Sequence, residues 1–338
     1  MSEGGSPIRV AVVGTGAISQ VVHIPMMVER YDVDVAVLAD EDPHKARTLA
    51  ERFGIPDVVE PEVALTREDV DGVLICTPNG VHEDMAIGAL EAGKHVFVER
   101  PIATSSAGAQ RVVDAARAAG RSLTVGMPHR FRPEVTALRS FVAGGELGPL
   151  YAVRGSWLTR KAPITRPTWR QDRDAAGGGA LIDLGVPALD LCLWIVGYPE
   201  IHRVFCRTWT GDHEVEDAAT LLFEAEGGVT FTVEVSNRLF AGEDRYYARV
   251  MGEDGSGSLP PLSVHKQLGG RPIDVTPRQP RPRGGESPYM NAYRRLLDQF
   301  VREAAGRSNP DMSDDHVRLM RLVEAAYESA ATGAEVTL

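Results

Sequence analysis

The stretch that decides the fold of this 338-residue chain is IRVAVV at residues 8–13, followed directly by GTGAIS at residues 14–19. A short apolar strand that enters a glycine-rich turn and then a helix is typical of dinucleotide-binding folds. Gly14 permits the tight turn, and Gly16 lets the backbone approach a pyrophosphate at the helix N-terminus. Ser19 replaces the usual third glycine and is small enough for close packing. We therefore expect a Rossmann domain.

Asp40 closes the second predicted strand, 24 residues after Gly16. A carboxylate at this place accepts hydrogen bonds from the adenosine ribose hydroxyls. Glu41 follows it, and two carboxylates would repel the 2′-phosphate of NADP. No arginine or lysine is expected to stand beside them to receive that phosphate. These residues predict NAD as the cofactor, bound by Gly14, Thr15, Gly16, Ala17, Ile18 and Asp40.

Strand-like and helix-like segments alternate along the first third of the chain, as in a parallel sheet. The predicted strands are 8–13, 33–39, 72–76, 95–98 and 122–125, and the predicted helices are 17–29, 43–53, 81–92 and 105–119. The expected fold class is an α/β Rossmann domain, a doubly wound parallel sheet, over residues 1–126.

After Gly126 the segments become longer and alternate on at least one face. The predicted strands here are 151–158, 203–209, 218–223, 229–236 and 246–251, and the predicted helices are 184–196, 289–305 and 315–331. The stretch 259–286 is rich in Pro, Gly and Arg and is predicted to be a loop. Residues 127–338 should form an α+β domain with an open, mainly antiparallel sheet for substrate and oligomerisation, whose C-terminal helix could pack back on the first domain.

Composition excludes several classes of partner. The formal net charge is −11, and no basic stripe is present to neutralise phosphates, so neither nucleic acid nor an anionic membrane surface is expected. Three widely spaced cysteines are expected as free thiols, and no cluster has metal-ligand spacing. The N-terminus is short and polar, and no apolar run approaches the length of a bilayer span. The sequence predicts a cytoplasmic protein without metal.

Four motifs then make the chain resemble the glucose–fructose oxidoreductase, inositol dehydrogenase and rhizopine-catabolism (Gfo/Idh/MocA) family. They are CTPNGVH at 76–82, ERP at 99–101, WR at 169–170 and GGGALIDLG at 177–185. The resemblance implies contacts along the nicotinamide half of the cofactor from Thr77, Pro78, Asn79, Glu99 and Arg100. It also implies that Trp169 and Arg170 reach the cofactor from the second domain. His82 is kept as a candidate cofactor contact, although a structural role at the start of its helix is the favoured interpretation.

The catalytic residues depart from the family pattern. Members that oxidise a sugar or cyclitol hydroxyl use a Lys in Glu-Lys-Pro and an Asp-x-x-x-His pair, whose i, i+4 spacing lets the carboxylate orient the imidazole. This chain keeps the Asp as Asp183 but has Arg100 and Pro187 in place of the Lys and the His. Arginine stays protonated and proline has no acid or base, although Arg100 can still hold an oxygen, a carboxylate or a phosphate. Asp183 is therefore the leading candidate base, and His129 is the alternative to it, unless His129 only packs.

Three interpretations remain open from the sequence. The first is an NAD-dependent oxidoreductase acting on a sugar-like, cyclitol, glycoside or polyol substrate with a rebuilt proton path. The second is a reductase of an imine or a conjugated carbonyl, which needs little base from the protein. The third is a catalytically silent protein that senses a sugar with its cofactor. His23 is interpreted as a packing residue, with a place in the cofactor cleft as the alternative. The apolar sheet face that includes Phe231, Val233 and Val235 predicts a homodimer or homotetramer.

Overall fold

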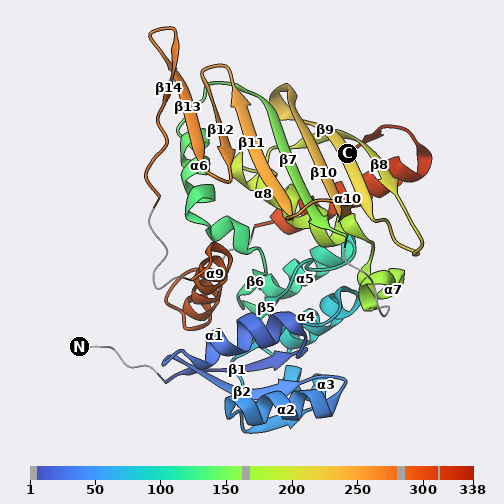
Figure 1. The fold of residues 1–338 in the computed structure, drawn as a ribbon. Coiled ribbons are helices and arrows are strands. Elements are labelled where there is room, and N and C mark those ends of the chain that lie inside the picture. Colours follow the sequence, from blue (N-terminus) through green and yellow to red (C-terminus); the bar gives the residue numbers. More distant parts are fainter. Residues whose placement is uncertain (1–5, 162–167, 280–285, 311–312) are drawn as a thin grey trace. The chain divides into compact units, whose positions relative to one another are not determined.

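The computed structural model describes residues 6–161, 168–279, 286–310 and 313–338. They form two compact units, shown in Figure 1. The first unit comprises Met1–Pro128 and Met290–His316, and the second comprises His129–Tyr289 and Val317–Leu338. The chain therefore leaves the first unit after Pro128 and returns to it near the C-terminus.

The first unit is built on a six-stranded parallel sheet in the order β3-β2-β1-β4-β5-β6. Its strands are β1 (Ile8–Val13), β2 (Val33–Ala39), β3 (Asp57–Val59), β4 (Gly72–Ile75), β5 (His95–Val98) and β6 (Leu123–Val125). The strand order reverses between β1 and β4, and dinucleotides bind at the carboxyl ends of the strands at such a point. The predicted Rossmann fold is confirmed.

Helices follow most of these strands. They are a π-helical segment (Ser19–His23) that continues into α1 (Ile24–Val28), then α2 (Pro43–Phe53), α3 (Pro61–Thr66), α4 (His82–Glu91), α5 (Ser106–Ala119) and, from the returning segment, α9 (Pro288–Ala304). Local sequence explains their ends. Asp42 caps α2 by accepting from the N–H groups of His44 and Lys45, and Gly54 ends it with φ +69°. Such a cap contributes about 1 kcal/mol.

The second unit is built on a nine-stranded sheet in the order β14-β13-β12-β11-β7-β10-β9-β8-β15. Its strands are β7 (Leu150–Arg160), β8 (Ile201–Trp209), β9 (Ala218–Ala225), β10 (Val229–Leu239), β11 (Arg245–Gly252), β12 (Gly255–Leu259), β13 (Ser263–Leu268), β14 (Arg271–Asp274) and β15 (Val336–Thr337). Only the β7–β10 pair is parallel among these described strands. The mainly antiparallel sheet is therefore confirmed. Its helices are α6 (Pro133–Ala143), α7 (Arg173–Ala176), α8 (Val186–Ile195) and α10 (Asp315–Thr332).

One face of this sheet is covered by helices of the same chain. Phe231, Val233 and Val235 are fully buried there, and α8 packs against β7 and β10. The expectation that this apolar face is open is wrong, because α8 and the turn before it fill it. The opposite face is mixed, with Leu222 and Tyr247 exposed among polar residues.

The stretch 259–286 was also predicted incorrectly. Residues 263–268 and 271–274 form a hairpin, β13–β14, and β12 pairs with both β11 and β13. These strands lie toward one edge of the sheet and carry many small or exposed residues, so they lack the apolar alternation that identifies a strand. Residues 280–285 of the predicted loop lie outside the described residues.

The helical stretch Arg173–Ile195 is long and apolar enough to cross a bilayer, and it is the one such helix among the described residues. Its most apolar window is 89% buried inside the protein, and Asp183 and Asp190 interrupt it. A buried core helix passes the same test of length and composition as a membrane span. The stretch is the central helix of the second unit.

Candidate active site

The glycine-rich turn after β1 has the geometry that the sequence predicts. Gly14 has φ +91°, and a Cβ there would lie 2.5 Å from the carbonyl oxygen of Cys76, so no other residue fits. A Cβ on Gly16 would meet nothing within 4 Å, which leaves open space above the turn at the helix N-terminus. Ser19 is fully buried, and its Oγ donates to the carbonyl of Gly14 at 2.5 Å. The turn is therefore closed by a serine hydroxyl where a third glycine is common.

Asp40 lies at the carboxyl end of β2, directly beside this turn. Its Oδ2 accepts from the backbone N–H and the hydroxyl of Thr15, both at 2.6 Å, and its Oδ1 accepts from the N–H of Asp42. Burial works against the charged form, but these donors and Lys45 hold the pKa of Asp40 below its usual value. The ionised carboxylate is thus oriented at the place where ribose hydroxyls are bound.

Lys45 corrects one premise of the sequence argument. Its Nζ lies 3.2 Å from Asp40 Oδ2. The expectation that no cation stands beside the carboxylates is wrong, because the first turn of α2 brings a residue five positions later back to Asp40. Lys45 pairs with Asp40 in this structure.

The motif after β4 is held by a buried histidine. His82 is fully buried, with Nε2 2.9 Å from the carbonyl of Thr77 and Nδ1 2.7 Å from the carbonyl of Pro101. Burial disfavours the charged ring and lowers the pKa of His82. The ring therefore bridges the turns after β4 and β5, which is the structural role favoured for it. Asn79 is also buried, beside Pro78.

The turn after β5 contains a polar network that the sequence did not reveal. The Glu99 carboxylate is 2.7 Å from Nε2 of His23, accepts from the Tyr293 hydroxyl at 3.1 Å and accepts from the N–H of Arg100 at 3.3 Å. All of these groups lie in the first unit. His23 is 76 positions and Tyr293 is 194 positions from Glu99, so no local pattern could have joined them.

The electrostatics of this network favour an ion pair. Burial disfavours the protonated ring, but the nearby Cys76 sulfur and the Glu99 carboxylate outweigh it and raise the pKa of His23 to about 10. Burial likewise disfavours the charged carboxyl, yet His23, Arg100 and Tyr293 hold the pKa of Glu99 below its usual value. The network is therefore an imidazolium and a carboxylate at neutral pH.

In the second unit, Asp183 occupies an unusual place. It lies in a π-helical segment, Leu181–Gly185, that precedes α8. From Gly178 to Leu193 every residue is buried except Asp183, which is exposed. A carboxylate is thus displayed on the surface by a helix that is otherwise part of the core.

The glycines before Asp183 explain how this helix begins. A Cβ on Gly179 would lie 1.9 Å from the carbonyl oxygen of Glu216, and one on Gly178 would lie 2.0 Å from the Tyr327 hydroxyl. The buried Glu216 Oε1 accepts from the N–H groups of Gly179 and Leu181 and from the Tyr327 hydroxyl, at 2.9–3.0 Å. Burial, followed by the Glu216 charge, raises the pKa of Tyr327, which keeps it a donor. The carboxylate caps the helix that presents Asp183.

The remaining two positions considered for the catalytic set, His129 and Pro187, are both buried. His129 is 6% exposed and packs edge-on against Trp157 at 4.8 Å between ring centroids, which resembles a packing role. Pro187 is buried at an early position of α8, directly after the π-helical segment Leu181–Gly185.

A buried ion pair lies beside His129. Arg130 donates to both oxygens of Asp190, including Nε to Oδ2 at 2.9 Å, and the Tyr198 hydroxyl also donates to Asp190. Asp190 is almost completely buried. No local pattern in the sequence indicated that these three residues meet.

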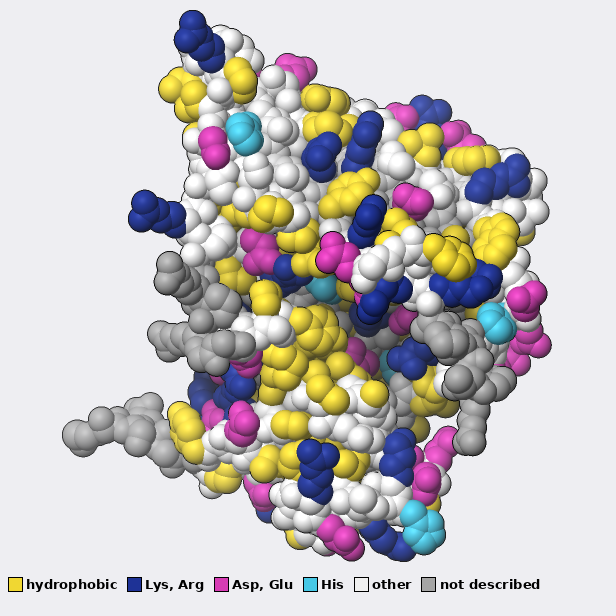
Figure 2. Space-filling view, in the orientation of Figure 1, with side chains coloured by type: hydrophobic (Ala, Val, Ile, Leu, Met, Phe, Trp, Pro, Cys, Tyr) yellow, Lys and Arg dark blue, Asp and Glu magenta, His cyan; other side chains and the backbone are white. Residues whose placement is uncertain are grey.

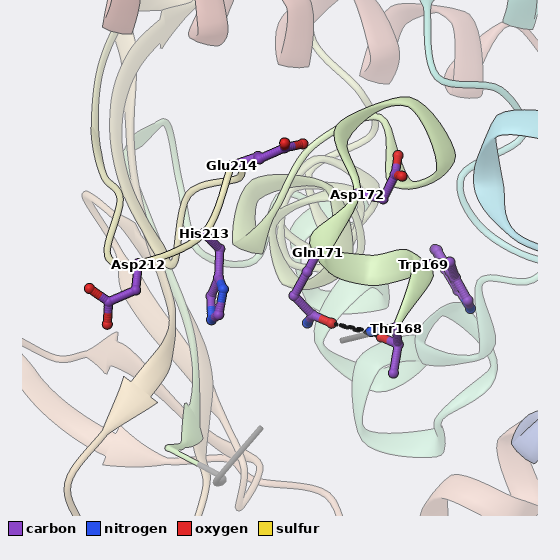
Figure 3. A pocket seen from close by; sticks show the side chains of 7 residues that line it. All are labelled: Thr168, Trp169, Gln171, Asp172, Asp212, His213 and Glu214. Carbon is purple, nitrogen blue, oxygen red and sulfur yellow. Dashed lines mark hydrogen bonds between the residues drawn. The ribbon is translucent and has the colours of Figure 1, made fainter. Parts of the chain in front are cut away.

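Trp169 and Arg170 lie on the surface of the second unit, where the guanidinium stacks 4.4 Å from the indole centroid. Trp169 also lines an open pocket of about 680 Å³ together with Thr168, Gln171, Asp172, Asp212, His213 and Glu214. In Figure 3 the side chains of Gln171 and His213 lie between the two segments that form this pocket, and Gln171 is hydrogen-bonded to Thr168. The lining combines one aromatic ring with hydrogen-bonding groups. Elsewhere on the face shown in Figure 2, basic and acidic side chains are interspersed.

Comparison with known proteins assigns this architecture to one family. Residues 8–127 match the family described as "Oxidoreductase family, NAD-binding Rossmann fold", and residues 135–258 match the "GFO/IDH/MocA C-terminal domain". The chain belongs to the Gfo/Idh/MocA oxidoreductase family, as its motifs predicted.

Three similar proteins extend the comparison. D-glucoside 3-dehydrogenase of Escherichia coli is 28% identical over 98% of both chains. D-xylose 1-dehydrogenase (NADP(+)) 2 of Haloferax volcanii is 30% identical over 97% of this chain and 98% of its own. The structure of GenD2 from gentamicin A biosynthesis, solved with NAD, has a TM-score of 0.86 at 28% identity and covers 100% of this chain and 98% of its own.

The chain is an oxidoreductase of this family with an NAD-binding Rossmann domain. The first unit fits the cofactor on its own geometry. It has a turn that only glycine can form at position 14, open space above Gly16, and an oriented carboxylate at Asp40. The described residues contain no group of three or more side chains arranged to hold a metal ion.

Proposed function

We propose that this protein interconverts a hydroxyl and a carbonyl group on a sugar-like, cyclitol or glycoside substrate, with Asp183 as the group that accepts the alcohol proton. The observation that carries the proposal is the exposure of Asp183 alone in a buried helix. An exposed carboxylate on this helix is accessible to a diffusing substrate, whereas the buried Asp190 of the same helix is committed to Arg130 and Tyr198. The named activities of the glucoside and xylose dehydrogenases support the substrate class.

The proposed reaction needs one group that accepts a hydride and another that accepts a proton. Bound NAD supplies the acceptor for the hydride that leaves the carbinol carbon. The proton of the same hydroxyl passes to Asp183, so the alcohol becomes a carbonyl. Arg100 stays protonated and therefore holds an oxygen of the substrate by donation rather than taking its proton. Asp183 does not need the imidazole that the family pattern supplies at position 187.

The cofactor-binding set of the proposal combines the two groups of residues predicted from the sequence. The turn and the β2 carboxylate supply Gly14, Thr15, Gly16, Ala17, Ile18 and Asp40. The resemblance adds Thr77, Pro78, Asn79, His82, Glu99, Arg100, Trp169 and Arg170. His129 remains an alternative catalytic base in this proposal.

Replacing Asp183 tests the proton assignment. A screen of polyols, sugars, glycosides and sugar acids, followed by NADH absorbance, first identifies a substrate. Asp183→Asn should then lower kcat by about two orders of magnitude while the NADH dissociation constant stays unchanged, because a positioned base is lost and the cofactor site is not.

Asp174→Asn is the matched control, since Asp174 is an exposed acid on the preceding helix α7. It should leave kcat unchanged. His129→Ala should also have little effect on kcat, and a loss there comparable to that of Asp183→Asn would transfer the base assignment to His129.

A second candidate function is favoured by the residues at positions 100 and 187. Arg100 and Pro187 stand where the family pattern has a Lys and a His, so two of its three proton-transferring residues are absent. In this candidate the protein binds a sugar and NAD without turnover. Sugar binding by calorimetry without NADH formation on any screened substrate would establish it and overturn the enzyme proposal. Arg100→Lys combined with Pro187→His would gain activity in a dormant enzyme and lose it in a specialised one. Turnover of an imine or conjugated carbonyl alone would indicate the third interpretation.

We also propose that the protein is a cytoplasmic homodimer or homotetramer. The mixed face of the nine-stranded sheet supports this, because Leu222 and Tyr247 are exposed there beside Arg154 and Arg249, and tyrosine and arginine are enriched at interfaces. Light scattering at micromolar concentration should give at least twice the monomer mass. Leu222→Lys should then shift it toward the monomer, whereas a monomeric wild type would contradict the proposal.

A further inference from the structure

The strongest unassigned feature is the buried network around Glu99 in the first unit. His23 is fully buried, Tyr293 is 2% exposed and Glu99 is 9% exposed. The His23 ring also packs edge-on against Phe97 and Tyr293, at 5.1 and 5.5 Å between centroids. A charged pair is thus enclosed by aromatic groups.

Stability alone does not account for this arrangement. Removing two charges from water costs as much as or more than their attraction returns, so a buried ion pair is often no more stable than apolar residues of similar volume. Such a pair does fix geometry, because each hydrogen bond to a charged group is directional and strong. The question is then which parts of the molecule are fixed.

The residues of the network come from three elements. His23 ends the π-helical segment that begins at Ser19, immediately after the glycine-rich turn. Glu99 follows β5, and its Oε2 accepts from the N–H of Arg100 and lies so close to Gly126, after β6, that a Cβ there would be 2.6 Å away. Tyr293 is on α9 of the returning segment. β1, β5 and β6 run parallel, so these connections meet at their carboxyl ends, where the cofactor binds.

We propose that His23 and Tyr293 are positioning residues for cofactor binding. Acting through the Glu99 carboxylate, they tie the helix after the glycine-rich turn to the Glu99-Arg100 turn. Two cofactor-binding segments far apart in the sequence are thereby held in one geometry. This inference rests on the binding of NAD and not on the role of Asp183, so either can fail without the other.

The protonation state of His23 supplies a readout that a merely structural residue would not change. The groups facing its ring are Cys76, Glu99 and Tyr293. Because the pKa of His23 is raised to about 10, its ring stays charged up to about pH 9 and loses the charge as the pH rises through 10. The depressed pKa of Glu99 keeps the carboxylate charged down to acid pH. NADH affinity should therefore be flat from pH 6 to 9 and fall above it.

The experiment measures the NADH dissociation constant from pH 6 to 10.5 by the fluorescence of NADH itself, without substrate, with circular dichroism to show that the fold persists. Tyr293→Phe removes only the hydroxyl and should weaken binding about threefold to tenfold, less than the full effect of a hydrogen bond to a charged group, because it acts on the cofactor only through Glu99. His23→Leu should weaken it more than tenfold. His23→Gln can still donate to Glu99, so it should bind within about threefold of wild type at pH 7.

The alkaline fall distinguishes positioning from packing. His23→Gln has no proton to lose in this range and should abolish the fall, while Cys76→Ser removes the largest influence that raises the pKa of His23 and should move the fall to lower pH. Phe300→Leu is the packing control, because Phe300 is buried on the same helix and contacts Phe97 at 6.0 Å between centroids. It should lower the melting temperature and leave the dissociation constant and its pH profile unchanged.

Three results would overturn the proposal. The first is wild-type NADH affinity in Tyr293→Phe. The second is persistence of the alkaline fall in His23→Gln. The third is a loss of affinity in Phe300→Leu equal to that in Tyr293→Phe. If His23→Leu does not fold, the two milder variants still decide the outcome.

Discussion

Each of the two units contains a buried carboxylate that is held by a basic side chain and a tyrosine hydroxyl. In the first unit the Glu99 carboxylate is held by the His23 imidazole and the Tyr293 hydroxyl, and in the second the Asp190 carboxylate is held by the Arg130 guanidinium and the Tyr198 hydroxyl. Both clusters are buried. The first lies in the turns at the carboxyl edge of the parallel sheet, whereas the second joins the start of the second unit to the middle and the end of α8.

Because the two clusters lie at different places, similar hydrogen-bonded ion pairs should affect different properties of the protein: its stability and its affinity for the cofactor. Arg130, Asp190 and Tyr198 are not among the proposed binding residues, although His129 is adjacent in the sequence. This cluster should therefore affect only the stability of the protein. The His23 cluster connects segments that bind the cofactor, so it should act on affinity as well. All four tryptophans of the chain lie in the second unit, which makes tryptophan fluorescence a selective probe of its unfolding.

The largest effect expected from this comparison is on stability in the second unit. Asp190→Ala leaves the Arg130 side chain, only 10% exposed, without its carboxylate. Breaking a buried ion pair in this way should lower the free energy of unfolding by about 3–5 kcal/mol. Urea denaturation followed by tryptophan fluorescence measures it.

Tyr198→Phe is the milder form of the same change and should cost about 1–2 kcal/mol. In the part of the protein that remains folded, both variants should bind NADH with wild-type affinity. If Tyr198→Phe weakened NADH binding as much as is expected for Tyr293→Phe, the Arg130 cluster would also affect cofactor affinity. The contrast drawn between the two clusters would then be wrong.

A smaller effect sharpens the comparison inside the first unit, where Asp40 is a carboxylate that faces the ligand rather than the core. Asp40→Ala should weaken NADH binding about tenfold, the effect of two lost hydrogen bonds to ribose hydroxyls, and should reduce the preference for NADH over NADPH, which in wild type should be at least tenfold. Fluorescence titration with both cofactors measures this.

Lys45→Ala is the informative companion to that variant. Lys45 neutralises part of the Asp40 charge, so its removal should increase the preference for NADH. Equal dissociation constants for the two cofactors in the wild type would remove the argument from Asp40 and Glu41.

The sequence predicted those elements whose signals are local. β1, β2 and α2 have the predicted bounds because buried apolar runs, Asp42 and Gly54 mark them without help from distant residues. The hairpin β13–β14 was missed because its residues are mostly exposed and its pairing is with other edge strands. α6 was missed although Pro133 stands at its first position.

The same limit applies to the site. The glycine turn and Asp40 could be recognised because they lie within one βαβ unit, and Lys45 was overlooked because helical geometry, not adjacency, brings it to Asp40. The network of His23, Glu99 and Tyr293 required tertiary contacts between residues far apart in the chain. The exposure of Asp183 could not be derived from its apolar surroundings, which predict only a buried helix.

The return of the chain to the first unit has a consequence for biosynthesis. Tyr293 leaves the ribosome only after residues 129–289 of the second unit have been made. At 5–20 residues per second this delay is roughly 8–32 seconds. During that time the nascent Rossmann sheet lacks α9. Phe97 is then not covered by Phe300, and Glu99 lacks the hydrogen bond from Tyr293. The second unit also waits for a late segment, because Val317–Leu338 follows α9 in the chain, so neither unit can be completed before the last helices have been synthesised.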